Sequence, residues 1–294
     1  MPPHLWFLGS AVFHYLGPSF AVLLFASVPV PGVAWMRIVS AAFVFAIWRR
    51  PWRAFVVAGS EAQRLMLGLG TVFAAMNYSF YVAIDRLPLG TVAAIEFVGP
   101  IVLALAGSRR PRNLTALALA VTGVYLLTDV RFQGDPGAFF WAFANGALFT
   151  IYIILAHRLA RADPKTSPID RLGASMIIAG IAITPLGIAQ AAPALMDPIV
   201  FGAGIGVGVS SSVVPYVFDQ MAMRELARAT YAVFVALLPA CAVMIGVVVL
   251  AQIPEPIEVL AVSLVITGVL THQEPTSDAT NGLHNVARDN RQSL

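Results

Sequence analysis

Long apolar segments separated by short polar stretches run along almost the whole chain. None shows the strict apolar–polar alternation of a strand, and in lipid only a helix or a closed barrel satisfies its own backbone. The pattern therefore predicts an all-α polytopic membrane protein with ten transmembrane helices. The expected spans are residues 5–27, 33–48, 65–84, 88–107, 112–130, 136–158, 172–190, 198–222, 227–251 and 256–271. The second is short for a full span, and the VPVPGV stretch before it is expected to extend it.

Composition supports the same class. The chain has 294 residues, of which 59% are hydrophobic and 11% charged, whereas soluble domains carry about 25% charge. This excludes a soluble enzyme and a disordered chain, and it leaves no room for a sizeable second domain. The single cysteine, Cys241, cannot form an internal disulfide. No metal cluster, nucleotide loop or nucleic-acid motif is apparent, so we expect no cofactor.

The basic residues predict how the helices are oriented. Of the 18 Lys and Arg residues, 15 fall in loops or tail on one side of a ten-helix arrangement. Only Arg86 and Arg131 fall on the other, and Arg37 lies inside a span. Because basic loops stay in the cytoplasm, both termini are expected there. The polar tail, residues 273–294, is expected to be a disordered cytoplasmic segment.

The two halves of the chain resemble each other. DRLPLGTVAAIEFVGP at 85–100 aligns without a gap with RELARATYAVFVALLP at 224–239, and VTGV at 121–124 pairs with ITGV at 266–269. Two five-helix repeats, residues 1–130 and 131–272, would have opposite orientations. Inverted repeats are typical of secondary transporters, whose substrate site lies near the bilayer midplane between the halves.

Glu96 is the clearest ionisable residue within a span. An ionised acid there costs about 2.5–3.5 kcal/mol on insertion scales, so it must be protonated, paired or facing a wet cavity. It suits proton coupling or capture of an ammonium group, although a neutral acid bonding a neighbouring helix is the alternative. Pro100 follows one turn later and Pro239 occupies the matching repeat position, so kinks are expected at both.

Other polar residues give weaker signals. Arg37 either clamps a substrate carboxylate or extends to the outer interface. Asp219 is either a site residue or an interfacial acid. His14 favours a bond between helices over proton transfer. Three sets of polar side chains share helix faces or lie two turns apart: Asn77 with Tyr78 and Tyr81, Ser212 with Tyr216, and Asn145 with Tyr152. They suggest a cavity for a small polar solute. The alternative is that they form hydrogen bonds between packed helices.

One stretch carries a family resemblance. MNYSFYVAIDRLPLGTVAAIEFVGP at 76–100, followed by SRRP at 108–111, resembles the EamA-type exporters of the drug/metabolite transporter superfamily, in particular the threonine/homoserine exporters. PGVAWMR at 31–37 and VPYVFD at 214–219 also fit. The chain departs from the pattern at Leu238, where the family often has Glu, and at Ala251–Gln252, where it often has Gly-Glu. Glu96 is then the main acidic candidate.

The resemblance implies export of amino acids or related metabolites across a bacterial plasma membrane, driven by protons. The chain is expected to act as a transporter rather than an enzyme, to need only a small-molecule substrate, protons and the bilayer, and to be able to act as a monomer. Efflux of lipophilic drugs or other metabolites is the alternative within transport. A membrane enzyme acting on lipid-linked substrates and a structural subunit are alternatives from other classes.

Overall fold

The computed structural model describes residues 3–107, 111–131, 135–162, 166–218 and 238–271, and every regular element in these ranges is helical. The prediction of an all-α fold is confirmed. Ten helices of at least seven residues are present in the described ranges, beside one short helix and one π-helical segment. They are α1 Pro3–Leu24, α2 Val30–Arg49, α3 Trp52–Val57, α4 Ser60–Ile84, α5 Leu89–Gly107, α6 Pro111–Arg131, α7 Pro136–Ala162, α8 Pro168–Met196, α9 Pro198–Gly208, η1 Val209–Val213, α12 Leu238–Leu250 and α13 Pro256–Thr271.

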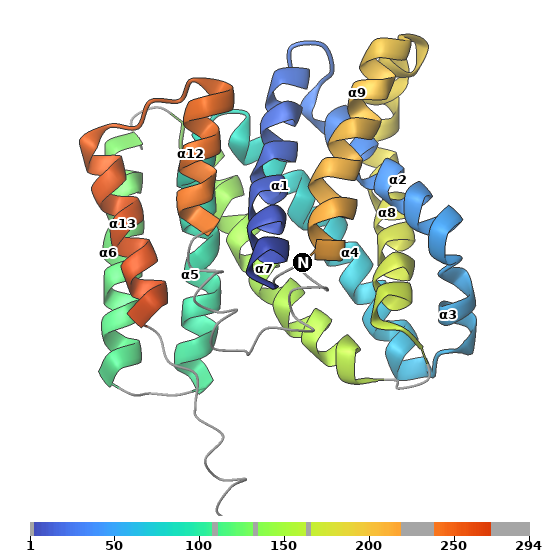
Figure 1. Cartoon of the computed structure of the whole chain (residues 1–294), viewed down its shortest axis with the longest axis horizontal. Helices are drawn as coiled ribbons and strands as arrows, with labels where there is room; N and C mark the ends of the chain where they lie inside the picture. Colours follow the sequence, from blue (N-terminus) through green and yellow to red (C-terminus); the bar gives the residue numbers. More distant parts are fainter. Residues whose placement is uncertain (1–2, 108–110, 132–134, 163–165, 219–237, 272–294) are drawn as a thin grey trace, which may run out of the picture.

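The helices form two groups with a shared centre (Figure 1). α5, α6, α12 and α13 lie together on one side, and α2, α4, α8 and α9 lie on the other, with α1 and α7 between them. The pairs in most extensive contact are α2 with α8 and α6 with α13, each within one group. Contacts of α1 with α12 and of α7 with α5 join the central helices to the first group.

Proline marks the start of many helices, since its fixed φ and missing N–H suit the first turn. α6, α7, α8, α9 and α13 all begin with Pro. α2 begins at Val30, inside the VPVPGV stretch, which confirms that this stretch extends the short second span. Asp197 caps α9 by accepting hydrogen bonds from the backbone N–H groups of Ile199 (2.8 Å) and Val200 (3.2 Å).

The observed helices follow the expected spans closely. Five of them are long and apolar enough to cross a membrane by length and composition, and shorter apolar helices accompany them. Two features were not predicted. α3 is a single short helix that exposes Trp52 and Val56, and the eighth span contains the π-helical turn η1. The first part of the expected ninth span lies outside the described residues.

Helix pairing shows a two-fold pattern. Contacts of α4 with α7 and with α8 have counterparts, five spans on, in contacts of α9 with α1 and with α2. Likewise, the contact of α5 with α6 corresponds to that of α12 with α13.

Glycines give the same pattern at atomic detail. A Cβ on Gly123 of α6 would meet the Ala261 carbonyl of α13 at 2.5 Å, and one on Gly268 of α13 would meet the Ala116 carbonyl of α6 at 2.6 Å. These glycines come from the VTGV and ITGV motifs, and Ala116 and Ala261 are separated by the same 145 positions as the two glycines. Their close backbone approach is reciprocal.

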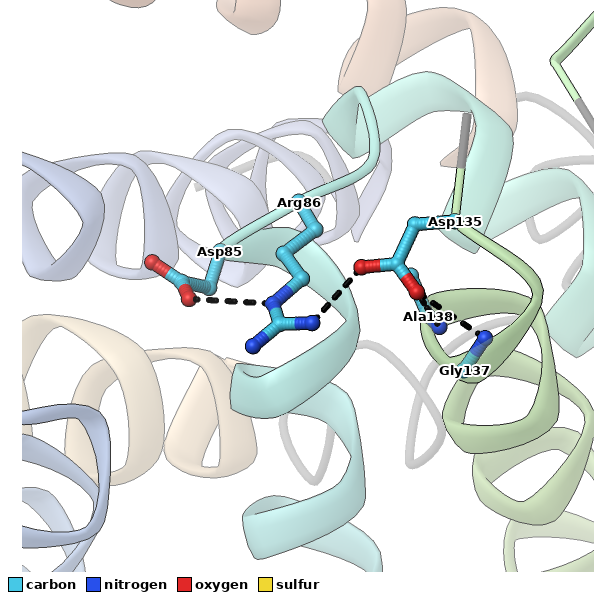
Figure 2. Close-up of polar contacts among 5 residues, drawn as sticks. All are labelled: Asp85, Arg86, Asp135, Gly137 and Ala138. Carbon is cyan, nitrogen blue, oxygen red and sulfur yellow. Dashed lines mark hydrogen bonds and ion pairs between the residues drawn. The ribbon is translucent and has the colours of Figure 1, made fainter. Parts of the chain in front are cut away.

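Ion pairs lie at both ends of the helix assembly. Arg49 of α2 pairs with Asp170 of α8 at 2.7 Å. At the other end, Figure 2 shows Arg86, in the turn after α4, reaching Asp135 before α7 at 2.6 Å. Asp135 also accepts hydrogen bonds from the N–H groups of Gly137 and Ala138. The hydrogen bond from Arg86 is the largest influence that holds the pKa of Asp135 below its usual value.

The departure at residues 251–252 has a structural consequence. Ala251 has φ 53°, a left-handed conformation that glycine adopts without strain. The next side chain, Gln252, accepts a hydrogen bond from the backbone N–H of Leu89 at 3.1 Å. Leu89 is the first residue of α5, so Gln252 satisfies a free donor at the start of that helix. The contact joins the two predicted repeats.

Candidate functional site

Arg37 is the centre of a buried cluster that we call the arginine subsite, made of Arg37, Tyr81, Ser211 and Ser212. Its side chain is only 6% exposed. Nε donates to the Ser212 hydroxyl at 3.1 Å, and one terminal nitrogen donates to the Ser211 carbonyl at 3.2 Å. The guanidinium lies over the Tyr81 ring, 5.2 Å from its centroid. No carboxylate in the described residues forms an ion pair with it.

Two polar atoms in the arginine subsite lack a good hydrogen bond. The Tyr81 hydroxyl lies near Ser211 and Arg37, but neither it nor the Ser211 hydroxyl has a partner of acceptable geometry, and both are buried. Unsatisfied buried hydroxyls cost about 1–3 kcal/mol each. A ligand with an acceptor oxygen at the Tyr81 hydroxyl would lower this cost, and a carboxylate also matches the charge and planar fork of the guanidinium.

The π-helical turn Val209–Val213 explains why Arg37 can bond to backbone here. A π-helical turn disrupts the regular i→i−4 ladder, which leaves carbonyls to accept other donors. Ser211 and Ser212 both lie within this turn. The close approach of α1 to η1 and of α9 to α2 depends on small residues, because a Cβ on Gly17 or Gly208 would collide with Ser211 or with Ser40 respectively. Such turns are frequent at functional sites.

Glu96 is the centre of a second cluster, the glutamate subsite, made of Glu96, Asn145 and Tyr15. The Asn145 amide nitrogen donates to Glu96 Oε1 at 3.2 Å. Asn145 and Tyr15 are buried, whereas Glu96 is partly exposed. Tyr15 of α1 lies close enough to interact electrostatically with Glu96. Glu96 and Arg37 also attract each other electrostatically, but they form no direct ion pair among the described contacts.

Aromatic rings pack beside Tyr15 of the glutamate subsite. His14 packs edge-on against Tyr216 (centroids 6.1 Å apart) and beside Tyr15. Tyr216 in turn packs on Phe73 of α4, 5.6 Å away. His14 also feels the charge of Arg37. The two subsites take their residues from α1, α2, α4, α5, α7 and η1, which belong to both helix groups and to the central pair of Figure 1.

A cavity of about 520 Å³ opens beside the turn that carries Arg86. Its wall includes Thr91 of α5, Val243 of α12 and Glu258 of α13. Thr91 precedes Glu96 by five residues, which is about 7.5 Å along a helix. The cavity lies at the end of the molecule where Arg86 pairs with Asp135, and its lining includes no residue of the glutamate subsite.

The structure brings together Arg37 and Tyr81. Glu96 occupies the second subsite, and Tyr216 packs against His14 and Phe73. Asn77 instead donates to the Phe73 carbonyl of its own helix at 2.8 Å and is 1% exposed. Tyr78 packs edge-on against Trp141 of α7, with ring centroids 5.6 Å apart. These contacts by themselves assign neither residue to a ligand site.

Asp219, Pro100 and Pro239, which the sequence singled out, lie in or next to the parts of the chain outside the described residues. Asp219 lies outside the described residues. Pro100 lies within α5, but its side chain is also outside them. Pro239 is buried in the first described turn of α12, and kinks at the two prolines stay predictions.

Sequence reasoning missed Tyr15 as a neighbour of Glu96 and missed the π-helical turn that serves Arg37. It also overlooked Glu258, which is 4% exposed and accepts a hydrogen bond from the Glu255 backbone N–H at 2.9 Å. Tyr15 was detectable only as a polar group beside His14. No group of three potential metal-ligating side chains occurs within the described ranges.

Apolar spans that carry an arginine on one helix group and a glutamate on the other are typical of a polytopic membrane transporter. The comparisons agree. The profile of the EamA-like transporter family matches residues 137–271. The chain is 33% identical to the threonine/homoserine exporter RhtA of Escherichia coli K12 over 256 residues, covering 85% of this chain and 84% of the relative. It is 32% identical, with the same coverage, to RhtA of Salmonella typhimurium LT2.

The chain thus belongs to the EamA-like transporter family. It is a multi-pass membrane transporter and not an enzyme, as the sequence predicted. A solved structure, titled only as the crystal structure of a protein, is 17% identical with a TM-score of 0.54 and covers 91% of this chain and 97% of its own length. That likeness concerns the fold alone.

Proposed function

We propose that the protein exports small amino acids across a bacterial inner membrane, in exchange for protons, by alternating access. The observation that carries this proposal is the presence of two opposite charges on different helix groups: the buried Arg37 on α2 and the partly exposed Glu96 on α5. Both have neutral hydrogen-bond partners, and neither neutralises the other in a direct ion pair. A zwitterion bound between them would supply a carboxylate to Arg37 and an ammonium to Glu96.

The polar character of both subsites favours an amino acid over a lipophilic drug. A drug pocket is mostly apolar with few oriented polar groups. Here a guanidinium, a tyrosine hydroxyl and two serines surround one end, and a carboxyl with an amide forms the other. The similar proteins from Escherichia coli and Salmonella typhimurium are threonine/homoserine exporters, which is consistent with this chemistry.

Alternating access is supported by the two-fold pattern of contacts. We take residues 1–130 and 131–272 as inverted repeats, on the basis of the aligned motifs and of the reciprocal glycine contacts between α6 and α13. The proposed orientation has both termini in the cytoplasm, because the basic loops lie on that side. The turn with Arg86 then faces outward.

Proton coupling would use Glu96, because it is the only acid of the two subsites. Substrate ammonium and a proton would compete for the same carboxyl, so that binding of one releases the other. Arg37 would remain charged throughout, since a guanidinium keeps its proton in proteins.

The proposal is tested with purified protein in liposomes under an imposed pH gradient. Labelled threonine and homoserine should move at rates at least about tenfold above those of their decarboxylated or N-acetylated analogues, each of which lacks one of the two charges. The same protein without a gradient should show only exchange. Equal rates for the amino acid and both analogues would contradict the two-charge site.

A further inference from the structure

Asn145 is fully buried and lies where α5 and α7 approach most closely. A Cβ on Gly146 would be 3.3 Å from the Ile95 carbonyl oxygen and 3.5 Å from Glu96 Cα. On the other helix, a Cβ on Gly99 would collide with Thr150. These two glycines bring the backbones together and fix which residues face each other. The opposition of Asn145 and Glu96 is therefore set by the backbone and not by two long side chains.

The hydrogen bonding of Asn145 is half complete. Its amide nitrogen donates to Glu96 Oε1 at 3.2 Å, but its amide oxygen is buried without a partner. Asn145 has no exposed surface, so a solute cannot reach this oxygen without moving a helix. An unsatisfied buried acceptor is costly unless another state of the protein supplies its donor.

That donor is present on the neighbouring residue. An ionised carboxylate only accepts hydrogen bonds, whereas a protonated one also donates. An amide offers both functions in nearly the same shape and does not itself titrate. Rotating the Asn145 amide by half a turn would exchange its nitrogen for its oxygen, so the same side chain can bind either form of Glu96.

We propose that Asn145 is a positioning residue that holds the Glu96 carboxyl in place in both of its protonation states. The inference rests on the proposed function, in which Glu96 exchanges protons with substrate. The amide donates to Glu96 when it is ionised and accepts from it when it is protonated. Without Asn145, the ionised carboxylate of Glu96 loses a hydrogen-bond donor and the protonated carboxyl loses its acceptor. Proton exchange at Glu96 is then no longer coupled to solute binding.

Other groups near Glu96 do not replace this role. Tyr15 of α1 and Arg37 of α2 act on it electrostatically, and Cys241 of α12 lies near Tyr15. None of them forms a described hydrogen bond to the Glu96 carboxyl. Within the described part of α7, Asn145 is the residue that does.

The test is a double-mutant cycle in proteoliposomes, with Asn145→Leu, Glu96→Gln and the combination of the two. Leu keeps most of the volume but removes both amide functions. Asn145→Leu should lower threonine flux driven by a pH gradient at least tenfold and alter its dependence on pH, while exchange without a gradient stays within about threefold of wild type. In the Glu96→Gln background, adding Asn145→Leu should change neither rate more than about twofold, because both residues act through one step.

Two comparisons keep the test decisive. Asn145→Gln, which retains the amide, should recover more of the gradient-driven flux than Leu. Phe143→Leu is the matched control, since Phe143 lies on the same helix two residues before Asn145 and is 46% exposed, and it should behave like wild type. Equal losses from Asn145→Leu with and without Glu96 would overturn the inference and assign a purely structural role. Wild-type flux in Glu96→Gln alone would instead refute the proposed coupling.

Discussion

The arginine and glutamate subsites differ in what their charge can do. Arg37 is permanently cationic and is held by a π-helical turn of the eighth span, within the helix group of α2, α4, α8 and α9. Glu96 can gain or lose its charge and lies on α5, in the other group, with a neutral amide beside it. A fixed charge suits recognition and a variable charge suits coupling. Their placement on separate helix groups lets a movement between the groups change how a solute meets them.

The largest effect is expected from removing the fixed charge. Arg37→Ala should reduce amino-acid flux by roughly 100-fold or more, because two hydrogen bonds to a charged group are together worth about 3–4 kcal/mol. It should also abolish discrimination against the decarboxylated analogue. Arg37→Lys keeps the positive charge but loses the planar, two-pronged guanidinium. Its flux should lie between those of wild type and Arg37→Ala.

The matched control for this prediction is Arg64→Ala. Arg64 is exposed and bonds the Ser60 carbonyl of its own helix, so its loss should leave flux unchanged. If Arg37→Ala still transported amino acids at a substantial rate and in preference to the decarboxylated analogue, Arg37 would not be the group that recognises the carboxylate.

The symmetry that relates the two repeats can be tested by stability. Gly123→Ala and Gly268→Ala should each lower the free energy of unfolding by about 1–3 kcal/mol, because each Cβ meets backbone of the partner helix. Since the contacts are reciprocal, the two losses should be similar. Gly202→Ala is the control, with nothing within 4 Å of its added Cβ. Unequal losses measured by thermal unfolding in detergent would argue against the reciprocal arrangement.

A smaller effect separates the two serines that serve Arg37. Ser212→Ala removes the acceptor of Arg37 Nε and should lower flux about tenfold, as expected for one hydrogen bond to a charged group. Ser211→Ala should lower it less than twofold, since Arg37 uses the Ser211 backbone carbonyl and the hydroxyl has no partner. A reversed order of the two variants would mean that the hydroxyl of Ser211 contacts the solute directly.

The smallest effect concerns the ion pair between Arg86 and Asp135, which lies outside the spans. Because the pKa of Asp135 is lowered in the folded protein, its contribution to stability is present above the ordinary aspartate value of about 3.9 and is lost as pH falls through the lowered value. Asp135→Asn should therefore narrow the difference in melting temperature between neutral and strongly acidic pH, by no more than about 3 °C. An unchanged acid dependence would show that the pair contributes nothing measurable.

The sequence predicted the helices well, because apolar span length and the proline starts are local signals. Extension of the second span into the VPVPGV stretch is an example. It also singled out Arg37 and Glu96 as candidate site residues, because a charged side chain inside an apolar span is conspicuous. It could not place Tyr15 beside Glu96 or Asn145 opposite it, because those contacts depend on how α1, α5 and α7 pack. The π-helical turn was equally hidden, as Ser210, Ser211 and Ser212 are compatible with a regular helix.

The most direct test of the account is solute-driven proton movement. Liposomes containing the protein and an internal pH indicator are given threonine on one side only, with no initial pH gradient. The account predicts that wild-type protein moves protons opposite to threonine, that Glu96→Gln moves no protons when threonine is added, and that the decarboxylated amine produces no signal. Proton movement of wild-type size in Glu96→Gln would contradict the assignment of Glu96 as the coupling residue.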